Sequence, residues 1–87
     1  MNNKKTISYF KNKSILITGG TGSFGKTFVK KLLEFKLKNI IVFSRDEKKQ
    51  EELRHELQNS KIKFILGDVR EKNSIEDATK DVDFIFH

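Results

Sequence analysis

The sequence predicts an α/β fold built on a parallel sheet, and two regularities of the chain carry that prediction. Four short apolar runs recur along its 87 residues, and the runs are continuous rather than alternating, as is typical of strands buried on both faces. Amphipathic stretches of helical length separate the runs. The resulting order, β-α-β-α-β-α-β with right-handed crossovers, predicts parallel strands covered by helices.

The predicted strands are rich in isoleucine and phenylalanine and cover 15–17, 40–43, 64–66 and 82–86. The chain stops on His87, directly after the fourth run, and a domain rarely stops on the last residue of a buried strand. We therefore expect the amino-terminal piece of a longer protein. In that case the fold is the truncated N-terminal half of a Rossmann-type doubly wound parallel sheet.

The first predicted helix begins near Ser23 and carries large apolar residues every three to four positions. Its buried face is expected to consist of Phe24, Phe28, Leu32 and Phe35. The second helix opens at a capping box, "SRDE" at 44–47, in which Ser44 caps the first turn. A third, shorter helix follows Asn73. The residues of these two helices expected to face inward are Leu53, Leu57, Ile75, Ala78 and Thr79.

Composition and charge narrow the possible classes of protein. The net charge is +6, but the lysines are spread over every element and interleaved with acids, which indicates a solvated surface and no nucleic-acid partner. No cysteine is present, so disulfides and thiolate metal sites are excluded. Residues 1–12 form a basic extension without the apolar region of a secretory signal. No apolar run is long enough for membrane insertion, so we expect a soluble, cytoplasmic protein.

The segment after the first strand fits two phosphate-binding patterns at once. "TGGTGSFG" at 18–25 reads T-G-x-x-G-x-x-G, the dinucleotide pattern, with Gly19, Gly22 and Gly25 at its glycine positions. "GTGSFGKT" at 20–27 reads G-x-x-x-x-G-K-T, a nucleoside-triphosphate P-loop ending in Lys26 and Thr27. In both patterns a glycine-rich turn brings the backbone, and the amide-rich start of a helix, close to a phosphate.

The position of the first helix favours the dinucleotide pattern. A helix that starts near Ser23 places Gly25 in its first turn, where a glycine lets the helix pack closely on the strand. The P-loop pattern would instead leave Phe24 in the loop that surrounds the phosphates, a poor location for a large apolar ring. Lys26 and Thr27 are then ordinary residues of the first helical turns.

The residues at the ends of the second and third strands also favour the dinucleotide pattern. The second strand ends in Ser44 and Arg45 rather than in an acid, which favours the 2′-phosphate of NADP over NAD, with Lys48 as a third phosphate contact. After the third strand, Asp68 is placed to accept a hydrogen bond from the adenine amino group, and Val69 to pack near the ring. The alternatives are an exposed Arg45 without a ligand and an ordinary Gly-Asp turn.

Taken together, "TGGTGSFG", "FSRDEKKQ", "LGDVR" and "VDFIFH" resemble the start of the extended short-chain dehydrogenase/reductases. More narrowly, they are similar to the bacterial UDP-N-acetylglucosamine 4,6-dehydratases of capsule, O-antigen and flagellin-sugar biosynthesis. The resemblance covers 13–87 and implies a partial NAD(P)-binding domain. It implies NADP held at the pyrophosphate by the three glycines, with Thr21, Ser23 and Phe24 completing the loop. It also implies a UDP-sugar substrate and a homo-oligomer when the protein is full length.

The residues that carry out the family's reaction would lie beyond His87, so the resemblance assigns no catalytic residue and no metal ligand to this chain. The spacing of Tyr9 and Lys13 matches the family's Tyr-x-x-x-Lys pair by accident, because both precede the first strand. His55 is expected to be exposed, and His87 lies toward the nicotinamide side without an assigned role. The alternatives are a UDP-sugar 4-epimerase, a non-catalytic NAD(P) sensor and, last, a P-loop NTPase.

Overall fold

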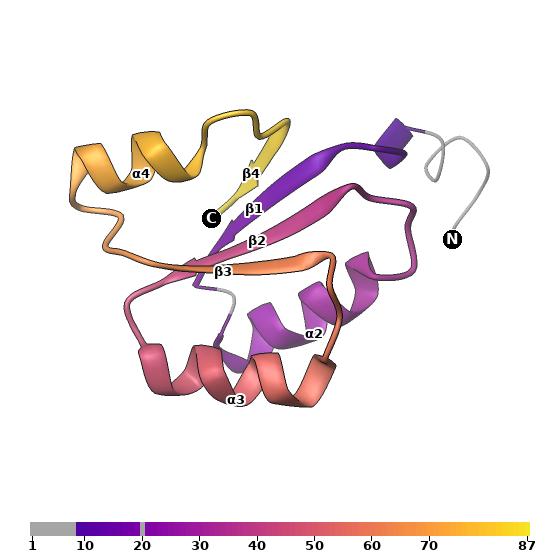
Figure 1. The fold of residues 1–87 in the computed structure, drawn as a ribbon, viewed down its shortest axis with the longest axis horizontal. Coiled ribbons are helices and arrows are strands. Elements are labelled where there is room, and N and C mark those ends of the chain that lie inside the picture. The colour runs from indigo at the N-terminus through magenta and orange to yellow at the C-terminus, as the bar shows by residue number, and fades with distance from the viewer. Residues whose placement is uncertain (1–8, 20) are drawn as a thin grey trace.

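The structure, a computed structural model, describes residues 9–19 and 21–87 and contains one four-stranded sheet with helices on both faces (Figure 1). The elements, in chain order, are β1 (Ser14–Thr18), α2 (Ser23–Leu32), β2 (Asn39–Ser44), α3 (Glu47–Leu57), β3 (Ile62–Leu66), α4 (Lys72–Ala78) and β4 (Phe84–Phe86). The strand order is β3-β2-β1-β4, and every pair is parallel. The predicted α/β class and Rossmann-type half sheet are confirmed.

The strand register brings the segments that follow the strands to one edge of the sheet. Thr18 at the end of β1 pairs with Phe43, and Ser44 at the end of β2 pairs with Leu66 at the end of β3. On the other side of β1, Ile17 pairs with Phe86. The loops after β1, β2 and β3 therefore start side by side, and in a doubly wound sheet this carboxyl edge is where ligands bind.

Side chains alternate across the sheet and form a core on each face, because successive residues of a strand point to opposite sides. Figure 1 shows α2 and α3 on one face and α4 on the other. The core beneath α2 and α3 contains Ile15, Ile17, Val29, Leu32, Leu37, Ile40, Val42 and Ile62. The core beneath α4 contains Leu16, Ile41, Phe43 and Ala78, with Ile65, Ile75 and Val82 packed against it.

Burial on both faces was predicted for all four strands, and this is wrong for the two outer ones. β1 is buried except at its last residue, Thr18, and β2 is buried except at its two ends. β3 and β4 lie at the edges, where Leu66 in β3 and Ile85 and Phe86 in β4 are exposed. A short apolar run looks the same in a central and in an outer strand, so the sequence did not distinguish them.

The buried face of α2 differs from the predicted one. Gly25, Val29 and Leu32 are its buried residues, whereas Phe24 is 83% exposed and stacks on the half-buried Phe28 at a ring-centroid distance of 6.3 Å. The prediction is correct at Leu32, and Phe28 and Phe35 pack half-buried against the same core, but it is wrong at Phe24, because it weighted side-chain size over the close approach of the helix at Gly25. Burying Gly25 brings the start of the helix close to the sheet.

The predicted cap of the second helix is also wrong. Ser44 is still part of β2, and the N-cap of α3 is Asp46, whose Oδ1 accepts a hydrogen bond from the Lys49 amide at 3.0 Å. Ladder pairing with Leu66 holds Ser44 in the strand, so the chain needs two more residues before the helix begins. The inward positions of both later helices are confirmed, with Leu53 and Ala78 buried and Leu57, Ile75 and Thr79 half-buried.

The described part of the amino-terminal segment packs against the domain. The Phe10 ring lies 5.4 Å, between centroids, from the rings of both Phe35 and Phe84. The division of the chain at residue 12 stays a prediction, and residues 1–8 lie outside the described residues. Within 9–19 and 21–87 there is no helix with both the length and the apolar character needed to cross a bilayer.

Candidate functional site

A hollow of about 410 Å³ opens at the carboxyl edge of the sheet, between the ends of β1, β2 and β3. Its walls come from four segments far apart in the sequence: Thr18, Gly19, Phe43, Ser44, Arg45, Gly67, Asp68, Val69, Arg70 and His87. Five predicted site residues meet here, namely Gly19, Ser44, Arg45, Asp68 and Val69. We call this hollow the edge cleft.

Five of the other predicted residues lie around the start of α2. Thr21, Gly22 and Ser23 line a second hollow between α2 and α3. Phe24 and Gly25 line a third, which shares Thr18, Gly19 and His87 with the edge cleft. Lys48 is exposed on the first turn of α3 and does not line the edge cleft. Gly20, in the middle of the turn, lies outside the described residues.

The glycine turn begins at Gly19, whose backbone conformation favours glycine. Its φ is +69°, in the left-handed region that residues with a Cβ rarely adopt. The Gly19 amide donates to the Phe43 carbonyl at 3.1 Å, and the Gly22 amide donates back to the Gly19 carbonyl at 3.3 Å. The first bond fastens the turn to the end of β2, and the second closes the turn onto the helix.

The start of α2 is free of its own capping groups. Gly22 is the N-cap and has no side chain to cap the helix, and the first turn contains no acidic residue. The Lys26 amide donates to the Gly22 carbonyl at 2.8 Å and so begins the helical ladder. The amides before it have no intrahelical acceptor, and together with the helix dipole they favour an anion at this end.

Gly67 shapes the floor of the edge cleft through its contact with the Phe43 ring. A Cβ built at Gly67 would lie 2.6 Å from Phe43 Cζ and 2.7 Å from Cε2, closer than carbon atoms can approach. Phe43 is fully buried, so its ring has no free space to move into. Only glycine allows the chain to cross this ring and deliver Asp68 to the cleft.

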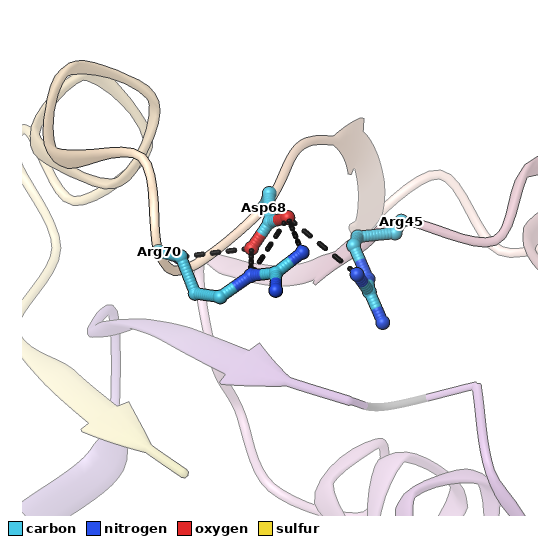
Figure 2. A network of polar contacts seen from close by, with 3 residues as sticks. All are labelled: Arg45, Asp68 and Arg70. Carbon is cyan, nitrogen blue, oxygen red and sulfur yellow. Dashed lines mark hydrogen bonds and ion pairs between the residues drawn. The ribbon is translucent and has the colours of Figure 1, made fainter.

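Asp68 lies between two arginines that project from different strand ends (Figure 2). The Arg70 guanidinium donates from Nη2 to Asp68 Oδ2 at 2.8 Å and from Nε to Oδ1 at 3.1 Å, and the Arg70 amide donates to Oδ1 at 2.9 Å. Arg45 Nη1 lies 3.6 Å from Oδ2. The hydrogen bonds from Arg70 hold the pKa of the Asp68 carboxyl far below its usual range, with a smaller contribution from Arg45.

Sequence reasoning missed Gln50, which fixes the end of β2. Gln50 is buried on α3, and its Nε2 donates to Ser44 Oγ and to the Ile65 carbonyl, each at 2.9 Å. The Ser44 oxygen therefore acts as an acceptor toward Gln50, which leaves its proton free to be donated toward the cleft. A glutamine in a highly charged helix gave no signal of this role.

Gly67 and Arg70 were also missed, although "LGDVR" contains a signal for each. A glycine directly after a strand indicates that another group approaches the backbone closely. An aspartate often accepts a hydrogen bond from the backbone amide two residues later, which closes a turn. His87 lies beside the end of β1, with its Nδ1 2.8 Å from Thr18 Oγ1, and its position relative to the nicotinamide stays a prediction.

Lys26 does not have the position that a P-loop requires. Its Nζ lies 2.7 Å from Glu56 Oε1 on α3, and Lys30 Nζ lies 2.8 Å from the other oxygen of the same carboxylate. Thr27 Oγ1 donates to the Ser23 carbonyl at 3.2 Å, within its own helix. A P-loop lysine and threonine would instead face the phosphates and the magnesium ion.

Tyr9 and His55 do not line the edge cleft. Tyr9 packs against Phe10 and Phe84 near the start of β4, on the edge of the sheet opposite the glycine turn. His55 is exposed on α3, as predicted. Across 9–19 and 21–87, no group of three or more histidine, cysteine, aspartate or glutamate side chains is placed to hold a metal ion.

Relatives of the chain are nucleotide-sugar enzymes by name. A UDP-glucose 4-epimerase of Rickettsia bellii (strain OSU 85-389) is 56% identical over 82 residues, which cover 90% of this chain and 24% of the relative. The UDP-glucose 4-epimerase of Rickettsia prowazekii (strain Madrid E) is 51% identical over 82 residues, which again cover 90% of this chain and 24% of the relative. This chain therefore spans about a quarter of the length of the curated relatives it matches.

Solved structures share the fold. Pen from Bacillus thuringiensis is 38% identical with a TM-score of 0.86, covering 91% of this chain and 25% of that one. WbmF from Bordetella bronchiseptica, solved in complex with NAD⁺, is 18% identical with a TM-score of 0.71, covering 91% and 23%. The likeness to WbmF shows a common fold and nothing finer.

The model of the polysaccharide biosynthesis protein family matches residues 15–87, which is nearly the whole described domain. This match and the named relatives confirm the resemblance to the amino-terminal part of the extended short-chain dehydrogenase/reductases. The chain belongs to the polysaccharide biosynthesis protein family.

Proposed function

We propose that this chain is the NADP-binding part of an enzyme that modifies UDP-sugars for surface polysaccharide synthesis. One observation carries the proposal: the glycine turn at Gly19, the Arg45 guanidinium and the Asp68 carboxylate meet at a single edge of the sheet, around the edge cleft. Each group suits a different part of an adenine dinucleotide, namely the pyrophosphate, the ribose phosphate and the base.

The glycine turn and the start of α2 would hold the pyrophosphate. The turn offers Gly19 and Gly22, neither of which has a Cβ to obstruct a phosphate, and the first amides of the helix lack intrahelical partners. Thr21, Ser23, Phe24 and Gly25 complete this binding loop. Phe24 contributes its backbone, because its ring stacks on Phe28 along the helix.

The end of β2 would hold the 2′-phosphate that distinguishes NADP from NAD. Arg45 offers a planar guanidinium, and Ser44 offers a hydroxyl proton that its bond from Gln50 leaves free. Lys48, exposed on the first turn of α3, would add positive charge near this phosphate. Asp68, held ionised, would accept a hydrogen bond from the adenine amino group, and the exposed Val69 would pack beside the adenine ring.

Bound nicotinamide supplies a reversible hydride acceptor, and this chain's contribution is to hold and orient the adenosine half of that cofactor. We propose a 4,6-dehydratase, in which hydride is taken from C4 of the sugar, the C5 proton and the C6 hydroxyl leave as water, and the hydride returns to C6, so that the cofactor ends in its starting state. The similarity of "SRDEKKQ" to the dehydratases favours this activity. The catalytic acid and base would come from the rest of the protein.

A UDP-sugar 4-epimerase is the second candidate, and the name of the Rickettsia relatives favours it. Both activities begin with oxidation at C4, so both need the same cofactor site. They differ after that oxidation, because the epimerase returns hydride to C4 and releases no water. This chain contributes equally to either reaction.

The cofactor proposal is tested by binding of NADP and of NAD to the whole protein that contains this chain. We expect tighter binding of NADP. Arg45→Ala should weaken NADP by about 1.5–3 kcal/mol, the value of a charge-assisted hydrogen bond, and leave NAD nearly unchanged. Arg54→Ala is the matched control, because Arg54 is an exposed arginine of α3 that pairs with Glu51 away from the cleft. Equal losses for both cofactors would refute the role of Arg45.

The reaction is tested by incubating the whole protein with UDP-N-acetylglucosamine and with UDP-glucose. A product lighter by one water identifies the dehydratase, and a C4 epimer of unchanged mass identifies the epimerase. Tight cofactor binding without turnover of either sugar would contradict both activities and favour a sensor. Nuclear magnetic resonance of the sugar ring distinguishes the products directly.

A further inference from the structure

The Arg45–Asp68–Arg70 cluster contains one more arginine than the proposed cofactor contacts use. Asp68 is only 19% exposed, whereas the side chains of Arg45 and Arg70 are 67% and 76% exposed. The carboxylate therefore lies at the base of the cluster, and both guanidinium groups extend from it toward solvent at the mouth of the edge cleft (Figure 2).

The two arginines share Asp68 unequally. Arg70 donates to both carboxylate oxygens, from Nε and Nη2, and adds its backbone amide. Arg45 lies 3.6 Å from Oδ2, beyond hydrogen-bond distance, and among the described residues its side chain donates no hydrogen bond. Arg70 thus occupies the carboxylate and neutralises its charge, and Arg45 keeps its donors available.

We propose that Arg70 is a positioning residue for cofactor choice: by binding the Asp68 carboxylate it keeps Arg45 available for a phosphate monoester at the cleft mouth. The proposal rests on the NADP function above and assigns Arg70 a part in it, although Arg70 itself touches neither the ribose phosphate nor the base. The phosphate recognised is the 2′-phosphate, since the pyrophosphate belongs to the glycine turn.

Loss of Arg70 would act on the phosphate in two ways. Among the described residues, Arg45 would then be the one arginine left to pair with Asp68. Direct pairing would draw the Arg45 guanidinium toward the carboxylate and away from the phosphate. The uncompensated charge of Asp68 would also repel the phosphate, which lies nearby in the same cleft. Both effects act on NADP and spare NAD, which has no 2′-phosphate.

The test measures dissociation constants of NADP and NAD for the whole protein and its Arg70→Met variant. We expect the preference for NADP to fall by on the order of tenfold, while NAD affinity changes little. The double variant Asp68→Asn/Arg70→Met should regain most of the preference, because the charge that Arg70 compensates is then gone. Any contact of Asp68 with adenine cancels in the ratio, since both cofactors carry adenine.

Lys72→Met is the matched control, because Lys72 is exposed at the start of α4 and its removal takes away one positive charge outside the cluster. An unchanged ratio in Arg70→Met, or a ratio that Asp68→Asn does not restore, would overturn the inference while leaving NADP binding intact. A wild-type protein that binds neither dinucleotide would refute the proposed function itself. Circular dichroism of each variant confirms that the affinities compare folded proteins.

Discussion

Lys26 Nζ lies 2.7 Å from Glu56 Oε1, so the lysine of the G-x-x-x-x-G-K-T pattern is joined to α3. Lys30 binds the other oxygen of the carboxylate, one helical turn further along α2. The hydrogen bond from Lys26 lowers the pKa of the Glu56 carboxyl most, and the hydrogen bond from Lys30 lowers it further. This carboxylate thus links α2 to α3, and the overlap with a P-loop motif is a coincidence of spacing.

Replacement of Lys26 by methionine is expected to leave dinucleotide binding unchanged. The pair with Glu56 is exposed, so its loss should change stability little, and Lys30 keeps Glu56 paired. The measurement is the affinity for NADP and for magnesium-ATP, before and after the substitution. Magnesium-dependent ATP binding that disappears in Lys26→Met would restore the P-loop interpretation. Lys31→Met is a matched control on the same helix.

The sequence was sufficient for the order and direction of the elements, because strands and helices differ in the period of their apolar residues. It was insufficient where the burial of a residue depends on which neighbouring element packs against it. Phe24 and Gly25 show this: hydrophobicity favoured Phe24 as the buried residue, but the close approach of α2 to the sheet selected Gly25. A strand at an edge and one at the centre were likewise indistinguishable.

The sequence predicted those residues of the candidate site that come directly after the end of a strand. Arg45 and Asp68 were found because the end of each strand is fixed by its apolar run, and parallel strands bring those ends together. Arg70 and Gln50 were missed because their roles are contacts to other side chains, Asp68 and Ser44. Such second contacts depend on side-chain geometry, which spacing alone does not specify.

Replacement of Gly67 by alanine is expected to destabilise the domain by about 1–3 kcal/mol, because the new Cβ would overlap the buried ring of Phe43. The ring or the loop must shift, and the loop carries Asp68 into the edge cleft. We therefore expect a lower thermal midpoint and weaker binding of both NADP and NAD.

Gly22→Ala provides the comparison for Gly67→Ala. A Cβ at Gly22 would meet only the Gly19 carbonyl oxygen, at an ordinary contact distance of 3.8 Å. The free protein should therefore keep its thermal midpoint, whereas pyrophosphate binding at the turn should weaken. If Gly67→Ala unfolds at the same temperature as the wild type, the contact with Phe43 does not constrain the loop.

Replacement of Gln50 by leucine is expected to cost about 1–3 kcal/mol, because Ser44 Oγ and the Ile65 carbonyl lose the amide that donates to both. The end of β2 would then be less well fixed, so NADP affinity should fall more than NAD affinity. Gln58→Leu is the control, since Gln58 is exposed at the end of α3. Equal stability of the two variants would contradict a structural role for the buried amide.

The stability that the Asp68–Arg70 pair contributes is expected to depend on pH in the acid range. Hydrogen bonds from Arg70 lower the pKa of Asp68 below its ordinary value of 3.8, so the folded protein resists protonation at this carboxyl more than the unfolded chain does. The contribution is therefore complete above that ordinary value and is lost as the pH falls below it, toward the pKa of the folded state.

Asp68→Asn tests this dependence, because it removes the titrating group and keeps the shape of the side chain. The thermal midpoint of the wild type should exceed that of the variant at neutral pH, and the difference should shrink as the pH falls below 3.8, the ordinary pKa of the carboxyl. In an Arg70→Met background the same comparison should show little dependence on acid, because the hydrogen bonds that lower the pKa are gone. A difference that stays constant with pH in the wild-type background would show that Asp68 and Arg70 are not coupled in solution.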